Sequence, residues 1–166
     1  MVHLFKLDKS DFQVMSPTGK FRLETVIPRL SGIAGAKHMS FDFRRLNPGS
    51  YSFPYHFHYN AEELFIIISG SATLRTPDGF QTVSEGDVVF FGMGEGGAHQ
   101  LYNNTTEPCL YFDLKTDRGA DLCEYPDSGK LGVVPSRLVF EKQTQVGYFK
   151  GEEDADSNWE KAGGKI

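Results

Sequence analysis

The chain has 166 residues and a formal charge of −5, which comes from 17 basic and 22 acidic residues. This length fits one domain with a core large enough to fold without disulfides or a structural metal. Charges of both signs are mixed along the chain, so no basic stripe indicates nucleic-acid binding and no polybasic segment indicates a membrane surface. We expect the partner to be a small molecule.

Neither the start of the chain nor its apolar runs indicate secretion or membrane insertion. Residues 1–10 lack the apolar core of a signal peptide, and no apolar run approaches the length of a membrane span. We therefore expect a soluble, cytoplasmic protein. Cys109 and Cys123 are too few and too far apart for a thiolate zinc site, and we interpret both as reduced packing residues.

Short blocks separated by tight turns predict an all-β protein. Eighteen glycines and eight prolines punctuate the chain, and its blocks lack the 3.6-residue period of amphipathic helices. In HMSFDFRRL, residues 38–46, positions 39, 41 and 43 are apolar and positions 40, 42 and 44 are polar, which predicts a strand with one covered face. Further strands are expected in a hairpin at 71–83, at 84–92 and at 108–116.

The strand LFIIIS, residues 64–69, is apolar on both faces. One face is expected to line the core. The other face then needs cover, either from the N-terminal segment 1–37 or from a second protomer. We favour the second protomer and therefore expect a homodimer.

The stretch YHFHYNAEELFIIISG contains two histidines that can act together. Residues two apart on a strand project to the same face, so His56 and His58 can reach one point. Glu63 lies an odd number of residues after His58 and joins that face only if the chain bends between them. His99 follows a glycine cluster and opens a later strand-like stretch. The spacing of the first two histidines fits metal ligation.

The segment from Gly49 to Gly70 resembles the first sequence motif of the cupin family. That motif has a glycine, an H-x-H pair, a glutamate and another glycine seven residues after the glutamate. Glu63, and not Glu62, has Gly70 at that distance.

The second cupin motif has a glycine, a strand, P-x-G-x-x-H and then an asparagine. Similar positions in this chain are Gly86, Gly94, Gly96, His99 and Asn103. Gly94 stands where the motif has proline, and the stretch that begins at Gly86 is two residues longer than the usual pattern. Two motifs in this order, separated by one hairpin, make the resemblance specific.

The resemblance implies a cupin double-stranded β-helix, a jelly-roll-like barrel that holds one divalent metal ion. The implied ligands are His56, His58, Glu63 and His99. Three imidazoles and a carboxylate suit Mn, Fe, Ni, Co or Zn, and an octahedral ion would keep two positions open. We expect the barrel to span residues 38–116, with an N-terminal extension of residues 1–37 packed on it and a C-terminal extension and tail of residues 117–166, all in one domain.

Five further residues are candidates for contacts around the metal or the substrate. They are Glu62, Asn103, Tyr125, Asp127 and Lys130. Glu62 would either face solvent or orient a metal-bound histidine, and Asn103 would either belong to a turn or play the same orienting role. The other three lie in residues 118–133, which form either a surface turn between strands or a cover over the barrel mouth.

Two classes of function stay open. One is a metal-dependent enzyme that acts on a small polar substrate, such as a sugar, a sugar phosphate or a carboxylate, by isomerase, dioxygenase or decarboxylase chemistry. The other is a non-catalytic ligand-binding or sensing cupin. The enzyme is favoured because the chain lacks room and pattern for an output module. A phosphosugar would need a basic clamp, for which the candidates are Arg44, Arg45, Arg75 and Lys130.

Overall fold

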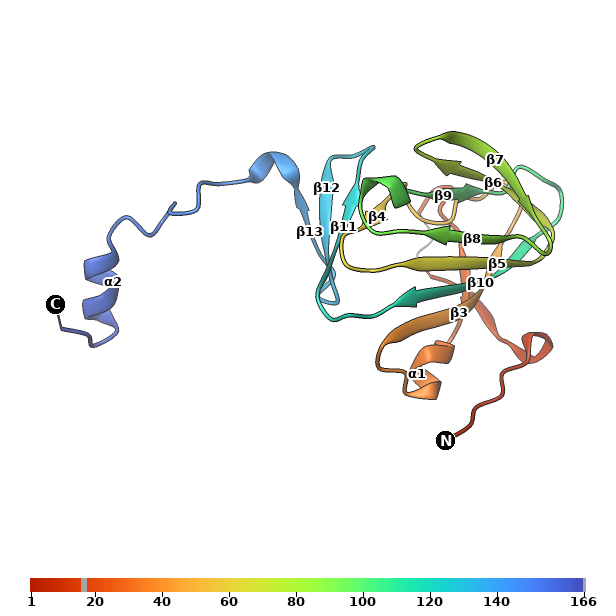
Figure 1. Cartoon of the computed structure of the whole chain (residues 1–166), viewed down its shortest axis with the longest axis horizontal. Coiled ribbons are helices and arrows are strands. Elements are labelled where there is room, and N and C mark those ends of the chain that lie inside the picture. Colours follow the sequence, from red (N-terminus) through yellow and green to blue (C-terminus); the bar gives the residue numbers. More distant parts are fainter. Residues whose placement is uncertain (16–17, 166) are drawn as a thin grey trace.

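The computed structural model describes residues 1–15 and 18–165 and confirms the predicted, mostly β architecture (Figure 1). The strands are β1 (Phe12–Val14), β2 (Glu24–Val26), β3 (Met39–Leu46), β4 (Phe57–His58), β5 (Glu63–Ser69), β6 (Ser71–Thr76), β7 (Gly79–Ser84), β8 (Val88–Phe91), β9 (Gln100–Tyr102), β10 (Cys109–Thr116), β11 (Asp121–Tyr125), β12 (Lys130–Val134) and β13 (Leu138–Glu141). The helices are α1 (Leu30–Ala34), α2 (Ala155–Lys161) and the short 3-10 turns η1 (Leu7–Lys9), η2 (Glu95–Gly97) and η3 (Lys142–Thr144). In the described ranges, no helix combines the length and the apolar character needed to cross a membrane.

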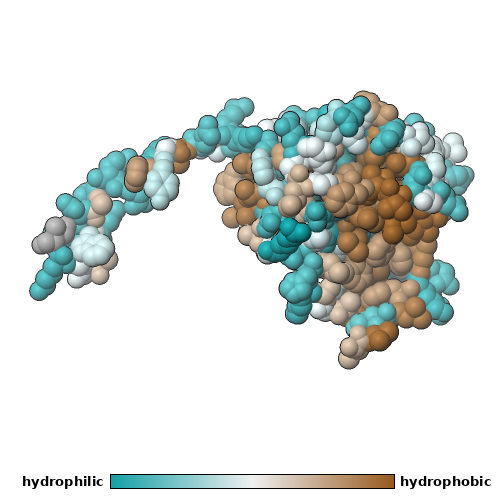
Figure 2. Space-filling view, in the orientation of Figure 1, coloured by the Kyte–Doolittle hydropathy of each residue, from teal (hydrophilic) through white to brown (hydrophobic). Residues whose placement is uncertain are grey.

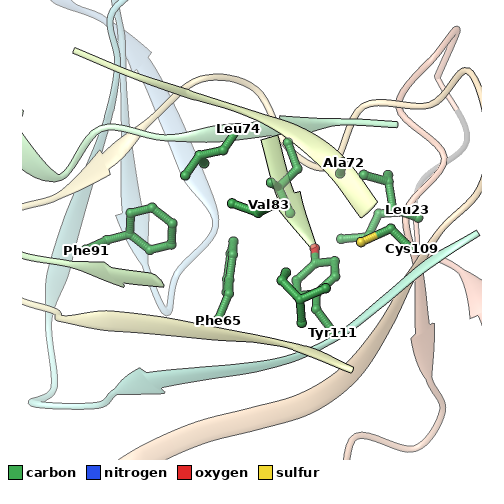
Figure 3. Packing of buried hydrophobic residues seen from close by; sticks show 11 residues of the cluster. Leu23, Phe65, Ala72, Leu74, Val83, Phe91, Cys109 and Tyr111 are labelled. Atoms are coloured by element: carbon green, nitrogen blue, oxygen red, sulfur yellow. The ribbon is translucent and has the colours of Figure 1, made fainter. Parts of the chain in front are cut away.

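The strands form three antiparallel sheets. The largest has the order β1-β2-β3-β10-β5-β8, the second β7-β6-β9 and the third β13-β12-β11-β4. The main core lies between the first two sheets, and Figure 3 shows its side chains meeting there. Phe65, Leu74 and Tyr111 in this core are each no more than 1% exposed. Each sheet therefore buries its inner face against the other.

The inner face of the largest sheet changes from apolar to polar along its strands. In the ladder between β5 and β10, Ile67 is opposite Tyr111 in the core, whereas Glu63 is opposite Lys115 at the other end. Ser40 of β3 is the partner of Lys115 on the other side of β10. Charged and polar side chains thus gather at one end of the sheet, beside the third sheet.

Strand β3 buries its polar face. Asp42 is 1% exposed and Arg44 is 4% exposed, whereas Met39 on the opposite face is 45% exposed. The hydroxyl of Thr25 donates a hydrogen bond to Asp42 at 2.7 Å, and Arg44 Nε donates to Asp113 at 2.9 Å. Burial of these charges is tolerated because they are paired and hydrogen-bonded. The alternating pattern predicted the strand correctly, but its covered face is the polar one.

The outer face of β5 and its neighbour β8 is only partly covered. Ile66 is 39% exposed, and Val88 and Phe90 are each 61% exposed. Figure 2 shows the resulting hydrophobic area. The N-terminal segment reaches this sheet at β3, where Phe5 packs edge-on against Phe41. The described part of residues 1–37 leaves Val88 and Phe90 of β8 largely exposed.

Both chain extensions are joined to the central strands. β1 pairs with β2 and β2 pairs with β3, which extends the largest sheet at its edge. β11 pairs with β4, the strand of the histidine pair. After β13 the chain leaves the sheets, and α2 lies well away from them (Figure 1).

Candidate metal centre

Three histidines lie close together because two segments distant in sequence run side by side. His58 ends β4, and His56 lies two residues before it. His56 and His99 form an isolated antiparallel bridge, in which each backbone N–H donates to the carbonyl of the other, at 3.3 and 2.9 Å. The ring centroid of His56 is 5.1 Å from that of His58 and 4.8 Å from that of His99. The predicted common point for these rings is therefore present.

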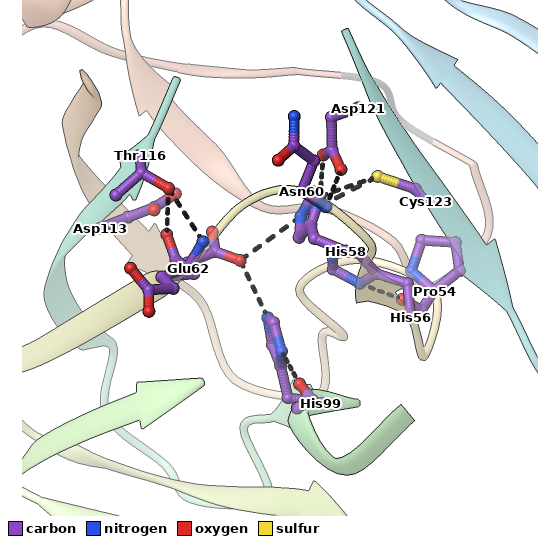
Figure 4. A network of polar contacts seen from close by, with 12 residues as sticks. Pro54, His56, His58, Asn60, Glu62, His99, Asp113, Thr116, Asp121 and Cys123 are labelled. Atoms are coloured by element: carbon purple, nitrogen blue, oxygen red, sulfur yellow. Dashed lines mark hydrogen bonds and ion pairs between the residues drawn. The ribbon is translucent and has the colours of Figure 1, made fainter. Parts of the chain in front are cut away.

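Glu63 joins the histidines because the chain bends between β4 and β5. The backbone N–H of Glu62 donates to Thr116 Oγ1 at 2.9 Å, which fixes the start of β5 against β10. Glu63 Oε2 then lies 3.3 Å from His99 Nε2 and 3.6 Å from His58 Nε2. Figure 4 shows the rings of His58 and His99 with contacts that lead to one carboxylate between them.

Backbone carbonyls fix the orientation of two of the rings. His56 Nδ1 donates to the Pro54 carbonyl, and His99 Nδ1 donates to the Gly97 carbonyl, both at 2.9 Å. A carbonyl can only accept, so each Nδ1 carries the ring proton and each Nε2 keeps a lone pair. These lone pairs are available to bind a cation.

The third ring is oriented by an acidic residue of β11. His58 Nδ1 lies 2.5 Å from Asp121 Oδ2, and the other oxygen of Asp121 accepts from the backbone N–H of Asn60 at 2.8 Å. Cys123 Sγ is 3.1 Å from the same nitrogen of His58. Burial, with the nearby Asp121 adding to it, raises the pKa of the Cys123 thiol to about 12. The thiol therefore stays protonated and packs against the ring.

Two buried polar atoms at this point have no partner among the described residues. They are Glu63 Oε2 and His99 Nε2, which lie close together but are both acceptors when Nδ1 carries the ring proton. One ligand atom from each of His56, His58 and Glu63 lies within 4.8 Å of the others. Unpartnered buried acceptors cost free energy, and a bound divalent cation would satisfy them. The donor set therefore fits the metal that the sequence motifs imply.

Burial sets the protonation states of the site. It lowers the pKa of His56 to about 3, with His99 adding to the effect, and it also lowers the pKa of His58. For Glu63, burial alone would raise the pKa, but the neighbouring histidines, His99 first among them, together outweigh burial and the pKa falls below its usual range. Neutral imidazoles and a carboxylate are the forms that bind a divalent metal.

The side chains of His56, His58 and Glu63 open on a cavity of about 190 Å³, whereas His99 lies behind them outside its lining. The cavity is lined by His56, His58, Glu63, Arg29, Lys115 and Tyr125, among others. The ring of Tyr125 stacks on that of His56, with centroids 6.0 Å apart. Cavities that hold drug-sized ligands measure roughly 300–1,000 Å³, so this one suits a smaller molecule.

Comparisons with known proteins agree with this geometry. The family model of the cupin domain matches residues 43–115. The chain therefore contains a cupin domain, over residues 43–115. Its double-stranded β-helix fold, expected from the two motifs, is thereby confirmed.

Three solved structures illustrate the shared fold. The first is a sugar phosphate isomerase from a cupin superfamily, from Silicibacter pomeroyi, which is 20% identical to this chain with a TM-score of 0.74. The match covers 88% of this chain and 98% of the other. A proposed sugar phosphate isomerase from Acidithiobacillus ferrooxidans is 22% identical, with a TM-score of 0.73, over 87% and 95%. A predicted oxalate decarboxylase from Thermotoga maritima is 18% identical, with a TM-score of 0.57, over 69% and 98%. No curated protein sequence matched the chain.

The loop before His99 departs from the cupin motif but still reaches the site. Gly94, in place of the motif's proline, has a φ of 81°, which favours glycine. Its backbone N–H donates to the His58 carbonyl at 2.8 Å and ties the loop to β4. The structure thus brings together all four implied ligands of this cupin: His56, His58, Glu63 and His99.

Glu62 and Asn103 lie outside the circle of ligands. Glu62 turns outward and pairs with Arg118 at 3.2 Å. Asn103 is fully buried, and its amide donates to the carbonyls of Leu46 and Glu107 at 2.7 and 2.8 Å, so it holds a turn. Neither side chain contacts a ring of the three histidines among the described contacts.

The three candidates in residues 118–133 separate in the structure. Tyr125 lines the cavity. Asp127 forms two hydrogen bonds with Arg75 on the surface, at 2.6 and 2.8 Å. Lys130 lies with its ammonium 5.6 Å from the centre of the Tyr125 ring and lines a different hollow. This segment forms strands β11 and β12, and its first strand borders the site.

The basic clamp expected from the sequence is not formed by the residues proposed for it. Arg45 points outward and pairs with Glu24 at 2.5 Å, and Arg75 is held by Asp127. Arg44 does point inward, but its guanidinium is engaged by Asp113. Alternation allowed only one of the two adjacent arginines to face inward, and the structure assigns that place to Arg44.

Sequence reasoning missed Asp121, Lys115 and Arg29. Asp121 and Arg29 lie outside both motifs, and only the pairing of distant strands brings them to the site. Lys115 had a local signal, because it shares a face with Asp113 in the otherwise largely apolar strand β10. Two charges on one face of such a strand indicate a polar end of the core.

Proposed function

We propose that this cupin is a metal-dependent enzyme that acts on a small polar substrate. The observation that carries the proposal is the convergence of three imidazoles and the Glu63 carboxylate beside a small cavity. A divalent ion held there would supply Lewis acidity, or redox chemistry if it were Fe or Mn. The proposed ligands are His56, His58, Glu63 and His99.

The chain's own residues would prepare the site for such a reaction. The Pro54 and Gly97 carbonyls fix two rings in the tautomer that presents Nε2. The ring of Tyr125 and the apolar side chain of Phe53 form part of the cavity wall, where they would exclude water from a bound substrate. His56 and Glu63 are buried, so their interactions with an ion or substrate would be weakly screened.

Isomerisation of a sugar phosphate is the reaction to assay first. The two solved structures that match nearly the whole chain carry this activity in their names. Several unrelated chemistries use one fold, so this support is by analogy. Dioxygenase or decarboxylase chemistry is the second class to assay, and a non-catalytic ligand-binding cupin is the alternative function.

Metal analysis tests the proposal directly. The protein should be purified without chelator and without a metal-affinity column, and then reconstituted separately with Mn, Fe, Co, Ni and Zn. We expect about one equivalent of metal in the wild type and its loss in His56→Ala. His38→Ala is the matched control, because His38 is exposed on the surface. Equal metal content in wild type and His56→Ala would overturn the ligand assignment.

Activity then distinguishes the classes. The metal-loaded protein should be tested for aldose–ketose conversion of sugar phosphates and for oxygen consumption or decarboxylation with small carboxylates. Turnover that His58→Ala abolishes supports the enzyme. Ligand binding at the metal-loaded site without turnover in any of these assays would instead favour the binding protein.

We also propose that the protein is a homodimer formed through the outer face of β5 and β8. Val88 and Phe90 in the edge strand are each 61% exposed, and Ile66 beside them is 39% exposed. An apolar patch of this kind on a folded protein often marks an interface. A symmetric dimer would cover the same patch on both copies.

A further inference from the structure

Three cationic side chains line the cavity beside the candidate metal ligands. They are Arg29, Arg44 and Lys115. The carboxylates in the same wall are Glu63 and Asp113, and Glu63 is already assigned to the metal. A divalent ion would add further positive charge. The cavity as a whole therefore favours an anionic occupant.

One of the three cations is already neutralised. Arg44 is 4% exposed, donates from Nε to Asp113 at 2.9 Å and also contacts Thr25. Its pairing stabilises the polar end of β3 and leaves little capacity for a ligand.

The other two cations have no such partner. Within the described ranges, neither Arg29 nor Lys115 forms an ion pair with a carboxylate. Among the described residues, the only side-chain hydrogen bond of the Arg29 guanidinium is to Met15 Sδ, at 3.9 Å, which is a weak acceptor. Both side chains are half-buried rather than extended into solvent. Half-buried cations that form no direct ion pair within the described ranges point to a binding role.

Their position places them between the cavity of the candidate metal centre and a second cavity. Lys115 is opposite Glu63 in the β5–β10 ladder, and Ser40 is opposite Lys115 in the β3–β10 ladder. Arg29 immediately precedes α1. Arg29, Ser40 and Lys115 line both the metal-side cavity and a second cavity of about 320 Å³. They therefore form the boundary that the two cavities share.

We propose that Arg29, Ser40 and Lys115 form an oxyanion clamp that holds a phosphate or carboxylate group of the substrate, with the rest of the substrate directed toward the metal. A guanidinium, an ammonium and a hydroxyl together offer several donors to the oxygens of such a group. This proposal rests on the proposed enzyme function and adds the chemical class of its substrate. The proposed clamp therefore consists of residues that line the cavity, and not of Arg45 and Arg75, the candidates named from the sequence.

Anion binding to purified protein tests the clamp without any activity assay. Inorganic phosphate, acetate and the neutral compound glycerol should be titrated calorimetrically, at low ionic strength, into metal-loaded and metal-free protein. We expect wild type to bind phosphate or acetate and not glycerol. Tighter binding of phosphate than of acetate would identify a phosphorylated substrate, and the reverse order would identify a carboxylate.

The variants are Arg29→Gln and Lys115→Gln, each expected to bind the preferred anion at least tenfold more weakly. Lys20→Gln is the control, because it removes an exposed positive charge outside the cavity and should bind within twofold of wild type. Arg29→Lys and Lys115→Arg keep the charge and should bind more tightly than the glutamine variants, provided that thermal melts show all of them folded. Binding by both glutamine variants at wild-type strength would overturn the clamp.

Metal content measured on the same samples separates the two proposals. Wild type that holds metal but binds none of the anions overturns the clamp and leaves the metal centre standing. Wild type that holds no metal but binds an anion through Arg29 and Lys115 overturns the metal-dependent function and supports the clamp.

Discussion

Asp121 and His58 are 63 residues apart in the chain, yet the Asp121 carboxylate lies 2.5 Å from Nδ1 of the His58 ring. β11, which carries Asp121, pairs with β4 and follows the matched cupin domain of residues 43–115. A carboxylate on the outer nitrogen of an imidazole fixes the ring and raises the basicity of the inner nitrogen. The C-terminal extension therefore helps to build the candidate metal site.

Replacing Asp121 with asparagine tests this role. We expect Asp121→Asn to weaken metal binding roughly 10- to 100-fold, because loss of a carboxylate behind a ligating histidine has effects of this size. Affinity is measured by competition with a chelator of known strength. Glu124→Gln is the control, since Glu124 lies on the same strand but pairs with Lys142 at the surface. Equal affinities in Asp121→Asn and wild type would show that the contact only packs β11 against β4.

The buried histidines of the metal-free protein should lower its stability as the solution is acidified from pH 6.5, whereas Asp113, whose pKa burial raises to about 7, acts in the opposite direction. The pKa of His56 is lowered to about 3 by burial, so between its ordinary value of about 6.5 and 3 the unfolded chain binds a proton that the folded chain does not. Each such histidine lowers the free energy of unfolding by about 1.4 kcal/mol per pH unit in that window. His58, with its pKa lowered in the same direction, adds to the slope.

Urea denaturation at pH 7.5, 6.5 and 5.5 measures this dependence. Glu63 does not contribute in that range, because its depressed pKa gives stability that is lost only below its unfolded pKa of about 4.5. His56→Gln should reduce the number of protons taken up on unfolding by about one, which flattens the plot of unfolding free energy against pH. His38→Gln should leave this plot unchanged. Equal pH dependence in His56→Gln and wild type would contradict the buried, neutral state of the His56 ring, because Asp113 contributes equally to both proteins.

The sequence predicted the mostly β architecture correctly, and the four residues that it implies as ligands lie close together in the structure. Alternation on a strand, turn chemistry and the H-x-H spacing are local properties, so they survive whatever the rest of the chain does. The sequence also indicated that Glu63 could reach the histidines only if the chain bends between His58 and Glu63, and this bend is present. It forms because Glu62 is anchored to Thr116 of β10.

The sequence could not show which face of β3 is covered. An apolar face normally packs inward, but Asp42 and Arg44 point inward here, where Thr25 donates to one oxygen of Asp42 and Asp113 accepts from Arg44. Those partners come from other strands, so no window around β3 contains the information. Asp121 and Arg29 were missed for the same reason.

A pair of adjacent glycines offers a test of how the loop holds His99. A Cβ at Gly97 would lie 1.8 Å from the Gly92 carbonyl oxygen, whereas a Cβ at Gly96 would meet nothing within 4 Å. We expect Gly97→Ala to lower the free energy of unfolding by about 1–3 kcal/mol, as overpacking does. It should also reduce metal content, because the Gly97 carbonyl orients His99. Gly96→Ala should stay within about 0.5 kcal/mol of wild type. Equal stabilities for the two variants in urea denaturation would contradict this packing.

The proposed dimer is tested at Phe90, whose ring is 61% exposed at the sheet edge. Phe90→Lys places a charge in the interface twice, once for each copy. At about 2 kcal/mol per copy, the dimer dissociation constant should rise roughly 1,000-fold. Light scattering coupled to size-exclusion chromatography measures the change from dimer to monomer. Phe140→Lys is the control, because Phe140 is 52% exposed but lies on β13, in a different sheet. A monomeric wild type, or a Phe90→Lys variant that remains dimeric, would show that this face is not the interface.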